Sequence, residues 1–137
     1  MKLQQNTLLA LYSALEFAAE PARVRSAAEI AQKYGASPHH LAKVLRKLGR
    51  AGLLHAARGA GGGYHFAGNA KRVTLMDVIE LFEDVGARSP RARRRTQEKA
   101  LEAVLAEIDE TARATFRSIT LQTMLRLTAR LAKRSPP

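Results

Sequence analysis

Apolar residues recur at three- and four-residue intervals along most of the chain, which is the spacing of amphipathic helices. The pattern is broken once, where Tyr64 and Phe66 alternate onto one face behind a glycine-rich stretch and predict a two-stranded hairpin. The fold class is therefore predicted to be mainly α with a two-stranded β element. Helices are expected over 7–19, after Ser26, from Pro38 to about Arg50, from Thr74, along about five turns to Ile119, and from Thr120.

The second and third predicted helices are joined by a tight turn. Ser26 and Glu29 have the spacing of a capping box at the start of the second helix, and Gly35 supplies the left-handed conformation that ends it. Ser37 then serves as the N-cap of the third helix, with Pro38 at its first position. Two helices this close, joined through a glycine, predict a helix-turn-helix.

The third predicted helix has an apolar face and a basic face. A basic outer face is what a helix that reads the major groove requires, because its N-terminal residues reach base edges and its later cations meet phosphates. The alternative is a solvated face on a structural helix; the tight turn, the caps and the hairpin behind it favour the DNA-reading interpretation. The apolar face comprises Leu41, Val44, Leu45 and Leu48, and the basic face His39, Lys43, Arg46, Lys47 and Arg50.

Charge and composition narrow the classes of partner. Lys and Arg number 23 against 12 Asp and Glu, a formal net charge of +11, which favours a polyanion over a generally basic surface without a partner. The excess is largest in residues 1–75, with 11 basic and 3 acidic side chains. No apolar run approaches the roughly 20 residues of a membrane span. Because the N-terminus also lacks a signal-peptide pattern, a cytoplasmic protein without a membrane partner is expected.

The hairpin offers a second contact with DNA. Arg58 lies where the chain becomes glycine-rich, so its side chain is expected to extend from a thin tip into a minor groove or to a phosphate. A nucleotide-phosphate loop is a weaker interpretation, because a Gly-x-Gly-x-x-Gly pattern would end on Tyr64 and the flanks are predicted strands. His55 and His65 could face each other across the hairpin, but two ligands fall short of a closed zinc site.

One family shares the motifs of this chain at 29–31, 41–48, 51–53, 58–64, 74–79 and 118–121. The chain resembles the Rrf-two (Rrf2) family of bacterial regulators, which contains IscR-like, NsrR-like and CymR-like proteins. The most specific shared motif is Arg-Gly-x-x-Gly-Gly-Tyr at 58–64. The resemblance implies a winged helix-turn-helix, a dimer built on the long penultimate helix, and a partly palindromic operator. It also implies that residues within 37–47 read the groove and that Arg58 acts from the wing.

The chain departs from that family in one respect. Many members hold an iron–sulphur cluster through three cysteines between the fourth helix and the long helix, and this chain has no cysteine. A cysteine-ligated cluster is therefore excluded, and no cofactor and no metal site are expected. The corresponding segment, 87–95, carries five arginines, for which a solvated loop is favoured over an added phosphate contact.

The long helix presents an apolar stripe that is expected to form the dimer interface, because an uncovered stripe on a small protein favours aggregation. The predicted organisation is a DNA-binding domain at 1–85, a basic linker or helix start at 86–97, and the dimerisation and C-terminal helices at 98–137. The stripe consists of Leu101, Val104, Leu105, Ile108, Ala112 and Phe116.

These features predict a sequence-specific transcription regulator, a repressor that binds double-stranded DNA as a homodimer, with any effector or partner protein left open. The alternative is a basic protein- or RNA-interaction module without sequence-specific DNA binding. An enzyme is not expected, because no nucleophile–base set, metal motif or phosphate loop supports one. The residues predicted to contact DNA are Ser37, His39, His40, Lys43, Arg46, Lys47, Arg50, Arg58, Gly59 and Tyr64.

Overall fold

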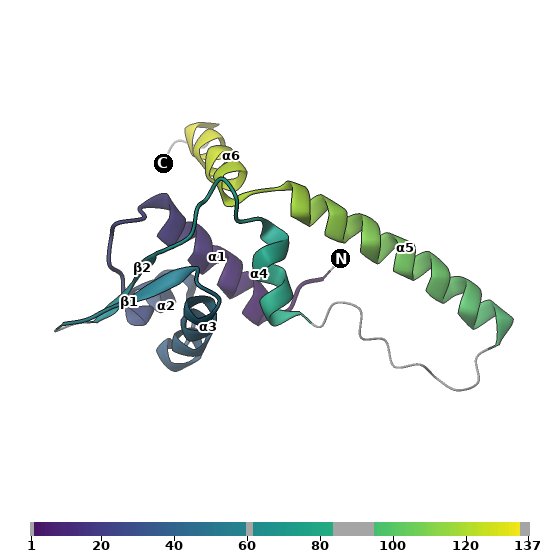
Figure 1. Cartoon of the computed structure of the whole chain (residues 1–137), viewed down its shortest axis with the longest axis horizontal. Helices are drawn as coiled ribbons and strands as arrows, with labels where there is room; N and C mark the ends of the chain where they lie inside the picture. The colour runs from purple at the N-terminus through teal and green to yellow at the C-terminus, as the bar shows by residue number, and fades with distance from the viewer. Residues whose placement is uncertain (1, 60–61, 84–94, 135–137) are drawn as a thin grey trace.

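The computed structural model describes residues 2–59, 62–83 and 95–134, and within these ranges it confirms a mainly helical fold with one two-stranded antiparallel sheet. The helices and the hairpin follow one another in the predicted order (Figure 1). Most predicted boundaries hold within two residues, as at the first helix, which begins at residue 5 rather than 7. The long helix begins earlier than predicted, at Thr96, because its first turn lies before the apolar stripe that indicated it. The elements are α1 (Gln5–Ala19), α2 (Ala27–Tyr34), α3 (Pro38–Arg50), β1 (Leu54–Ala57), β2 (Gly63–Phe66), α4 (Leu75–Phe82), α5 (Thr96–Ser118) and α6 (Leu121–Arg134).

The turn between α2 and α3 is built as its residues predict. Gly35 ends α2 with φ of 65°, a left-handed conformation that glycine adopts without steric cost. Ser37 caps α3 by accepting a hydrogen bond from the backbone N–H of His40, at 3.3 Å. One expectation is corrected: Ser26 caps Glu29 N–H, but the Glu29 carboxylate does not complete a capping box. It accepts instead from Nε of Arg25, a charged donor that binds a carboxylate more strongly than a backbone amide does.

The hairpin is joined to the helical body along one edge. β1 and β2 pair antiparallel, with His55 opposite His65 and Leu54 opposite Phe66. Beyond β2, the loop between α1 and α2 adds a short bridge, in which Arg25 pairs with Tyr64. Leu54 and Phe66 are buried, so the base of the hairpin belongs to the core while its outer end extends from it (Figure 1).

The hydrophobic core surrounds α1, which packs against α3, α4 and α6. Phe17, Leu41 and Leu45 are fully buried there. Leu121, at the start of α6, is also fully buried, so the core around α1 includes a residue from near the C-terminus. Main-chain hydrogen bonds fix this junction, because Leu75 N–H donates to Ile119 and Leu121 N–H donates to Val73, each at 2.9 Å.

The long helix α5 projects away from this core (Figure 1). Over its 23 residues none is fully buried, although Phe116 near its C-terminal end packs partly against the core. Among the described residues, no helix combines the length and the apolar character needed to cross a membrane.

Candidate nucleic-acid interface

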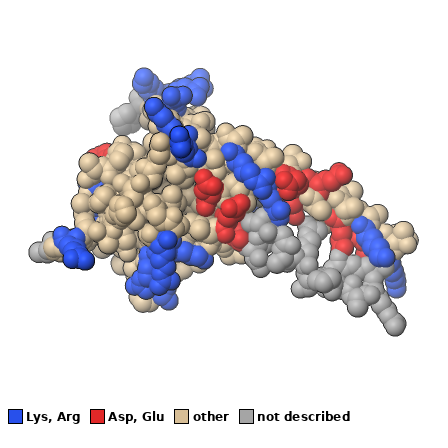
Figure 2. All heavy atoms as spheres, in the orientation of Figure 1, with Lys and Arg blue, Asp and Glu red and all other residues tan. Residues whose placement is uncertain are grey.

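The two faces predicted for α3 are separated in the structure. Leu41, Val44, Leu45 and Leu48 are at most 3% exposed and pack into the core. On the other side, four exposed cations line an open hollow of about 370 Å³. Figure 2 shows basic side chains gathered over α3, with a second group near the outer end of the wing. The residues that line the hollow are Lys43, Arg46, Lys47 and Arg50.

These four cations lie close together on one helix. In the part of the chain that the structure describes, no carboxylate forms an ion pair with any of them. Lys47 has an aromatic neighbour, since its Nζ lies 4.9 Å from the centroid of the Phe82 ring on α4. Adjacent uncompensated cations raise the local potential and favour a polyanion such as a phosphate backbone.

The N-terminal turn of α3 holds three further predicted contact residues in different settings. Ser37 is occupied as the N-cap, and His39 is exposed. His40 is half-buried, and its Nε2 lies 2.5 Å from Oδ1 of Asn6 on α1. The contact with Asn6 was not predicted from the sequence, because residues 34 positions apart give no local signal. It directs His40 toward α1, whereas His39 remains exposed.

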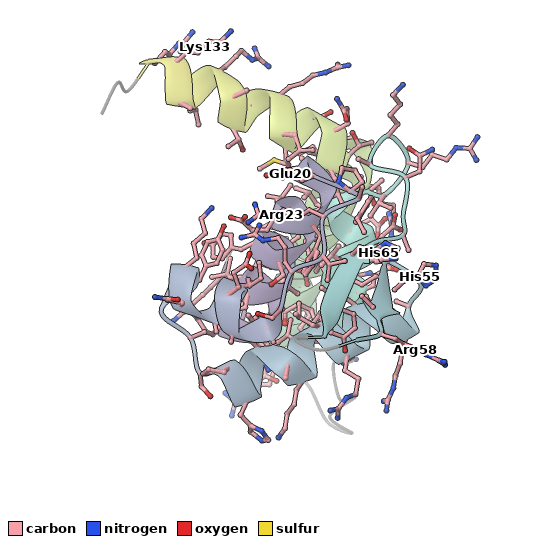
Figure 3. The ribbon with its side chains drawn as sticks, turned by 90° about the vertical axis from the view of Figure 1, so that its left-hand side faces the viewer. Glu20, Arg23, His55, Arg58, His65 and Lys133 are labelled. Carbon is pink, nitrogen blue, oxygen red and sulfur yellow. The ribbon has the colours of Figure 1, made fainter. Side chains whose placement is uncertain are left out.

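The wing places Arg58 at the end of β1. Arg58 is exposed, and Figure 3 shows it projecting from the hairpin, with His55 and His65 on the same strands. Gly59 follows with φ of 130°, a conformation that L residues rarely adopt. Tyr64 is half-buried, and its ring lies beside Gly49 on α3. It therefore packs between the wing and α3 rather than extending from the wing. Residues 60 and 61 of the glycine motif lie outside the described residues.

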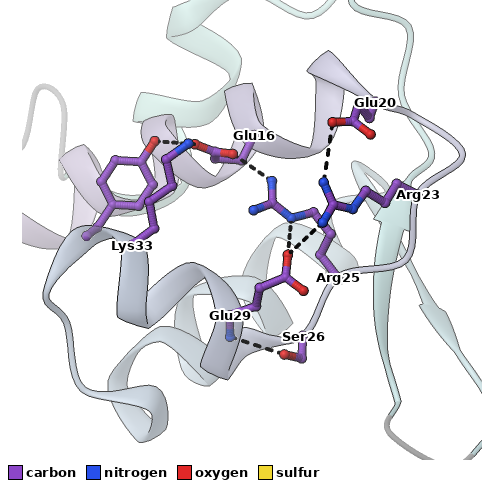
Figure 4. Close-up of polar contacts among 8 residues, drawn as sticks. Glu16, Glu20, Arg23, Arg25, Ser26, Glu29 and Lys33 are labelled. Carbon is purple, nitrogen blue, oxygen red and sulfur yellow. Dashed lines mark hydrogen bonds and ion pairs between the residues drawn. The ribbon is translucent and has the colours of Figure 1, made fainter. Parts of the chain in front are cut away.

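A charged cluster that the sequence did not predict lies between α1, α2 and the wing (Figure 4). Glu16 accepts hydrogen bonds from Arg25 at 2.6 Å and from the Tyr34 hydroxyl at 2.6 Å, and pairs with Lys33 at 2.5 Å. Burial raises the pKa of Glu16, but hydrogen bonds from Lys33, Tyr34 and Arg25 outweigh this effect and lower its pKa to about 2. Burial lowers the pKa of Arg25, and hydrogen bonds with Glu16 and Glu29 raise it above the usual value. Glu16 and Arg25 are therefore both charged at neutral pH.

The two histidines of the wing lie opposite each other on β1 and β2. His55 and His65 face each other as predicted, with ring centroids 5.7 Å apart. Within the described ranges, no group of three or more His, Cys, Asp or Glu residues is arranged to hold a metal ion. The five-arginine segment begins among residues 84–94, which lie outside the described residues; Arg95 precedes α5 as its N-cap.

The residues predicted for the dimer interface divide into two groups on α5. Leu101, Val104 and Ile108 are between 53% and 60% exposed, and Leu105 is 38% exposed. Ala112 and Phe116 are half-buried, and Phe116 contacts the core of its own chain. The exposed apolar surface is therefore concentrated on the N-terminal half of the helix, away from the folded body.

Comparison with known proteins assigns this arrangement to a family. The model of the family described as "Rrf2: iron-dependent transcriptional regulator" matches residues 3–127. BadM of Rhodopseudomonas palustris, which is named as an HTH-type transcriptional regulator, is 51% identical over 129 residues, covering 93% of this chain and 83% of BadM.

Solved structures show the same fold. CymR of Bacillus subtilis, described as the global cysteine regulator, superposes with a TM-score of 0.75 at 26% identity, covering 93% of this chain and 98% of CymR. IscR of T. potens superposes with a TM-score of 0.66 at 26% identity, covering 93% of this chain and 88% of IscR. The helix-turn-helix, the wing and the long helix are thus shared with known transcription regulators.

Proposed function

This chain belongs to the Rrf2 family of DNA-binding transcription regulators, and on that basis we propose that it is a repressor that binds a partly palindromic operator as a homodimer. One observation carries the proposal: the outer face of α3 presents Lys43, Arg46, Lys47 and Arg50 as a single cationic surface, beside a wing that presents Arg58. A helix of this kind enters the major groove and a wing reaches the neighbouring groove. Such a protein acts on the chromosome and therefore in the cytoplasm.

The homodimer is supported by α5. Leu101, Val104 and Ile108 are each more than half exposed on the same helix, and a second copy of that helix is the simplest partner to cover them. Two copies related by a twofold axis present two α3 helices to the duplex. A symmetric pair of reading helices requires half-sites in inverted order, which is why the proposed operator is partly palindromic.

The description of the family names iron, and the residues of this chain do not fit a cysteine-ligated iron–sulphur cluster. Thiolates are the usual protein ligands of such clusters, and the whole sequence contains no cysteine. The four histidines include only one facing pair, His55 and His65. We therefore propose that the regulator binds its operator without a cysteine-ligated cluster, so that its response to any signal depends on other chemistry.

Operator selection tests the function directly. The purified protein is incubated with random duplexes, bound sequences are recovered, and the selected duplex is compared with scrambled DNA and with RNA of the same sequence. We expect an inverted repeat to be enriched, with two chains bound per duplex and an affinity that falls steeply with salt as counterions are released. Equal affinity for all duplexes, or a preference for RNA, would instead support the interaction-module alternative.

The direction of regulation needs a separate measurement. Transcription in vitro from a promoter that contains the selected operator is expected to fall when the protein is added. The same template with a scrambled operator serves as the control. An increase in transcript from the intact operator would make the protein an activator and contradict the repressor proposal.

A further inference from the structure

The loop between α1 and α2 holds the wing through its main chain. Arg25 N–H donates to the carbonyl of Tyr64, and Tyr64 N–H donates to the carbonyl of Arg25, both at 2.9 Å. Two residues further along β2, Phe66 N–H donates to the carbonyl of Pro21 at 3.2 Å. β2 is therefore attached to this loop at two points, and the position of the loop determines the position of the strand.

The Arg25 side chain in turn attaches that loop to the helices. It is only 11% exposed, and its Nη1 donates to Glu16 on α1 at 2.6 Å while its Nε donates to Glu29 on α2 at 2.5 Å. Figure 4 shows the guanidinium between the two carboxylates. A planar guanidinium with donors on two edges can satisfy both acids at once, which a lysine ammonium does less well. One residue therefore links α1, α2 and β2.

The contact is close enough to restrict the residue beside Tyr64. A Cβ atom added at Gly63 would lie 2.4 Å from the carbonyl oxygen of Arg25, so any larger residue must move the strand or the loop. At Gly62 a Cβ would meet the carbonyl oxygen of Ala57 at 3.4 Å, an ordinary contact. The glycine at 63 is thus required by the approach of the Arg25 main chain.

We propose that Arg25 is a positioning residue, which holds the wing at a fixed orientation to α3 and thereby determines where Arg58 meets the DNA. The inference rests on the proposed function, because it assigns a residue to the geometry of the same DNA contact. Tyr64 completes the connection, since its main chain binds Arg25 and its ring lies beside Gly49 on α3. The helix α3 and the wing then form one rigid surface for DNA rather than two independent contacts.

Amide hydrogen exchange tests the attachment without DNA. In Arg25→Gln, exchange at the Tyr64 amide is expected to rise by about tenfold or more, because the loop that accepts its hydrogen bond loses both carboxylate contacts. The amide of Leu75, which donates to Ile119, reports global stability and should change much less. Arg23→Gln is the matched control: Arg23 lies in the same loop and pairs with Glu20 and Glu29, but its side chain is 51% exposed.

A double-mutant cycle tests the consequence for DNA. Affinity for the selected operator is measured for the wild type, Arg25→Gln, Arg58→Ala and the double variant. If Arg25 positions Arg58, the Arg58→Ala loss should be smaller in the Arg25→Gln background by a factor of about three or more. A purely structural role would lower affinity by the same factor in both backgrounds. If Arg25→Gln does not fold, Glu16→Gln takes its place in the cycle, because it weakens one of the two carboxylate contacts of Arg25.

Alanine substitutions at the two neighbouring glycines test the proposal independently. Gly63→Ala should reproduce the effects of Arg25→Gln on Tyr64 exchange and on the Arg58 coupling, whereas Gly62→Ala should behave as the wild type. Unchanged Tyr64 exchange together with zero coupling would overturn the inference while leaving the DNA-binding function intact. Faster exchange with zero coupling would also overturn it, because the wing would then be held without guiding Arg58. If the wild type selects no duplex, the proposed function fails, and the exchange measurement alone decides whether Arg25 holds the wing.

Discussion

Replacing Arg58 on the wing with lysine keeps the positive charge but changes the chemical group that carries it. Arg58 is exposed directly after β1 and is followed by Gly59, which has no side chain and therefore keeps the adjoining backbone slim. The φ of this glycine, 130°, is one that larger residues rarely adopt. A minor groove is only about 6 Å wide, and a weakly hydrated planar guanidinium enters it more readily than a strongly hydrated ammonium. A phosphate contact makes no such distinction. Substitutions at position 58 can therefore distinguish insertion into a minor groove from contact with a phosphate.

We expect Arg58→Lys to lose most of the affinity lost in Arg58→Ala, chiefly on operators with A·T-rich steps beneath the wing. Fluorescence anisotropy with duplexes that differ only at those steps measures the effect. Arg126→Lys is the control, because Arg126 is exposed on α6, on the opposite side of the molecule from α3 (Figure 1). Full binding by Arg58→Lys, with no dependence on the flanking sequence, would leave only the phosphate contact.

Glu16 makes folding stability depend on acid in a defined range. Its pKa is about 2 in the folded protein against 4.5 for the free side chain, so the stabilisation it provides is complete above pH 4.5 and lost as the pH falls toward 2. Glu16→Gln should lower the free energy of unfolding by about 1.5 to 3 kcal/mol near neutral pH, the range for hydrogen bonds to charged groups. Urea unfolding at pH 7 and pH 3 should show this difference shrinking in acid. Glu20→Gln, whose partner Arg23 is half exposed, should change little at either pH, and a constant Glu16→Gln difference would be inconsistent with the lowered pKa.

Some contacts of individual side chains could not be predicted from the sequence. No sequence motif marks Arg25 or Glu16, because the partners of Glu16 come from α2 and from the loop before it. The capping box at Ser26 is incomplete for a similar reason, because the Glu29 carboxylate accepts a hydrogen bond from Arg25 instead of from the backbone. Local spacing predicts which backbone donors are free at a helix start. It cannot predict a cation brought in from a neighbouring loop.

Among the elements, α3 presents one basic face, along which we propose two kinds of DNA contact. His39 and Lys43 lie toward its N-terminal end, where side chains reach base edges, and Lys47 and Arg50 lie in its last turn. The caps and the alternation of apolar and basic positions made this helix predictable, because a short helix with Ser37 and Pro38 at its start leaves little freedom in register. The contact of His40 with Asn6 was not predictable, since it depends on how α1 crosses α3.

Loss of Lys47 or Arg50 should weaken binding by a similar factor on every duplex. Lys47→Ala or Arg50→Ala should also reduce the slope of log affinity against log salt by about 1, the signature of one lost phosphate contact. His39→Ala or Lys43→Ala should instead change which operators are selected. Arg130→Ala on α6 is the control for a lost positive charge. If all four variants keep both the affinity and the preference of the wild type, α3 is not the reading helix.

For the whole molecule, the sequence pattern predicted the long helix but not the limits of the core. Leu121 is fully buried beside α1, and α6 packs on α1 although they lie at opposite ends of the chain. Small residues on α1 such as Ala10 and Ala14 are buried because other helices approach closely, and they give no hydrophobic signal in the sequence. Contacts between distant segments decide burial at this scale, and periodicity describes only one helix at a time.

The projecting helix gives the molecule one long apolar surface without an intramolecular partner among the described residues. Leu101, Val104, Leu105 and Ile108 lie at three- and four-residue intervals and are exposed. A second α5 can cover this surface, and the resulting pair would carry two reading helices. Dimerisation is therefore expected to be a requirement for operator binding rather than an independent property.

A charge within this surface should separate the two chains. In Ile108→Asp, association would bury an unpaired carboxylate against apolar side chains, which costs several kcal/mol. Sedimentation at micromolar concentration should show a dimer for the wild type and a monomer for Ile108→Asp, with the helical circular dichroism of the compact body retained. Ala106→Asp adds the same charge to the same helix at an exposed position outside the stripe, and it should remain a dimer. Operator affinity should fall sharply in Ile108→Asp and not in Ala106→Asp, because only the dimer engages both half-sites at once. A wild-type chain that sediments as a monomer, or an Ile108→Asp chain that remains dimeric, would show that α5 does not form the interface.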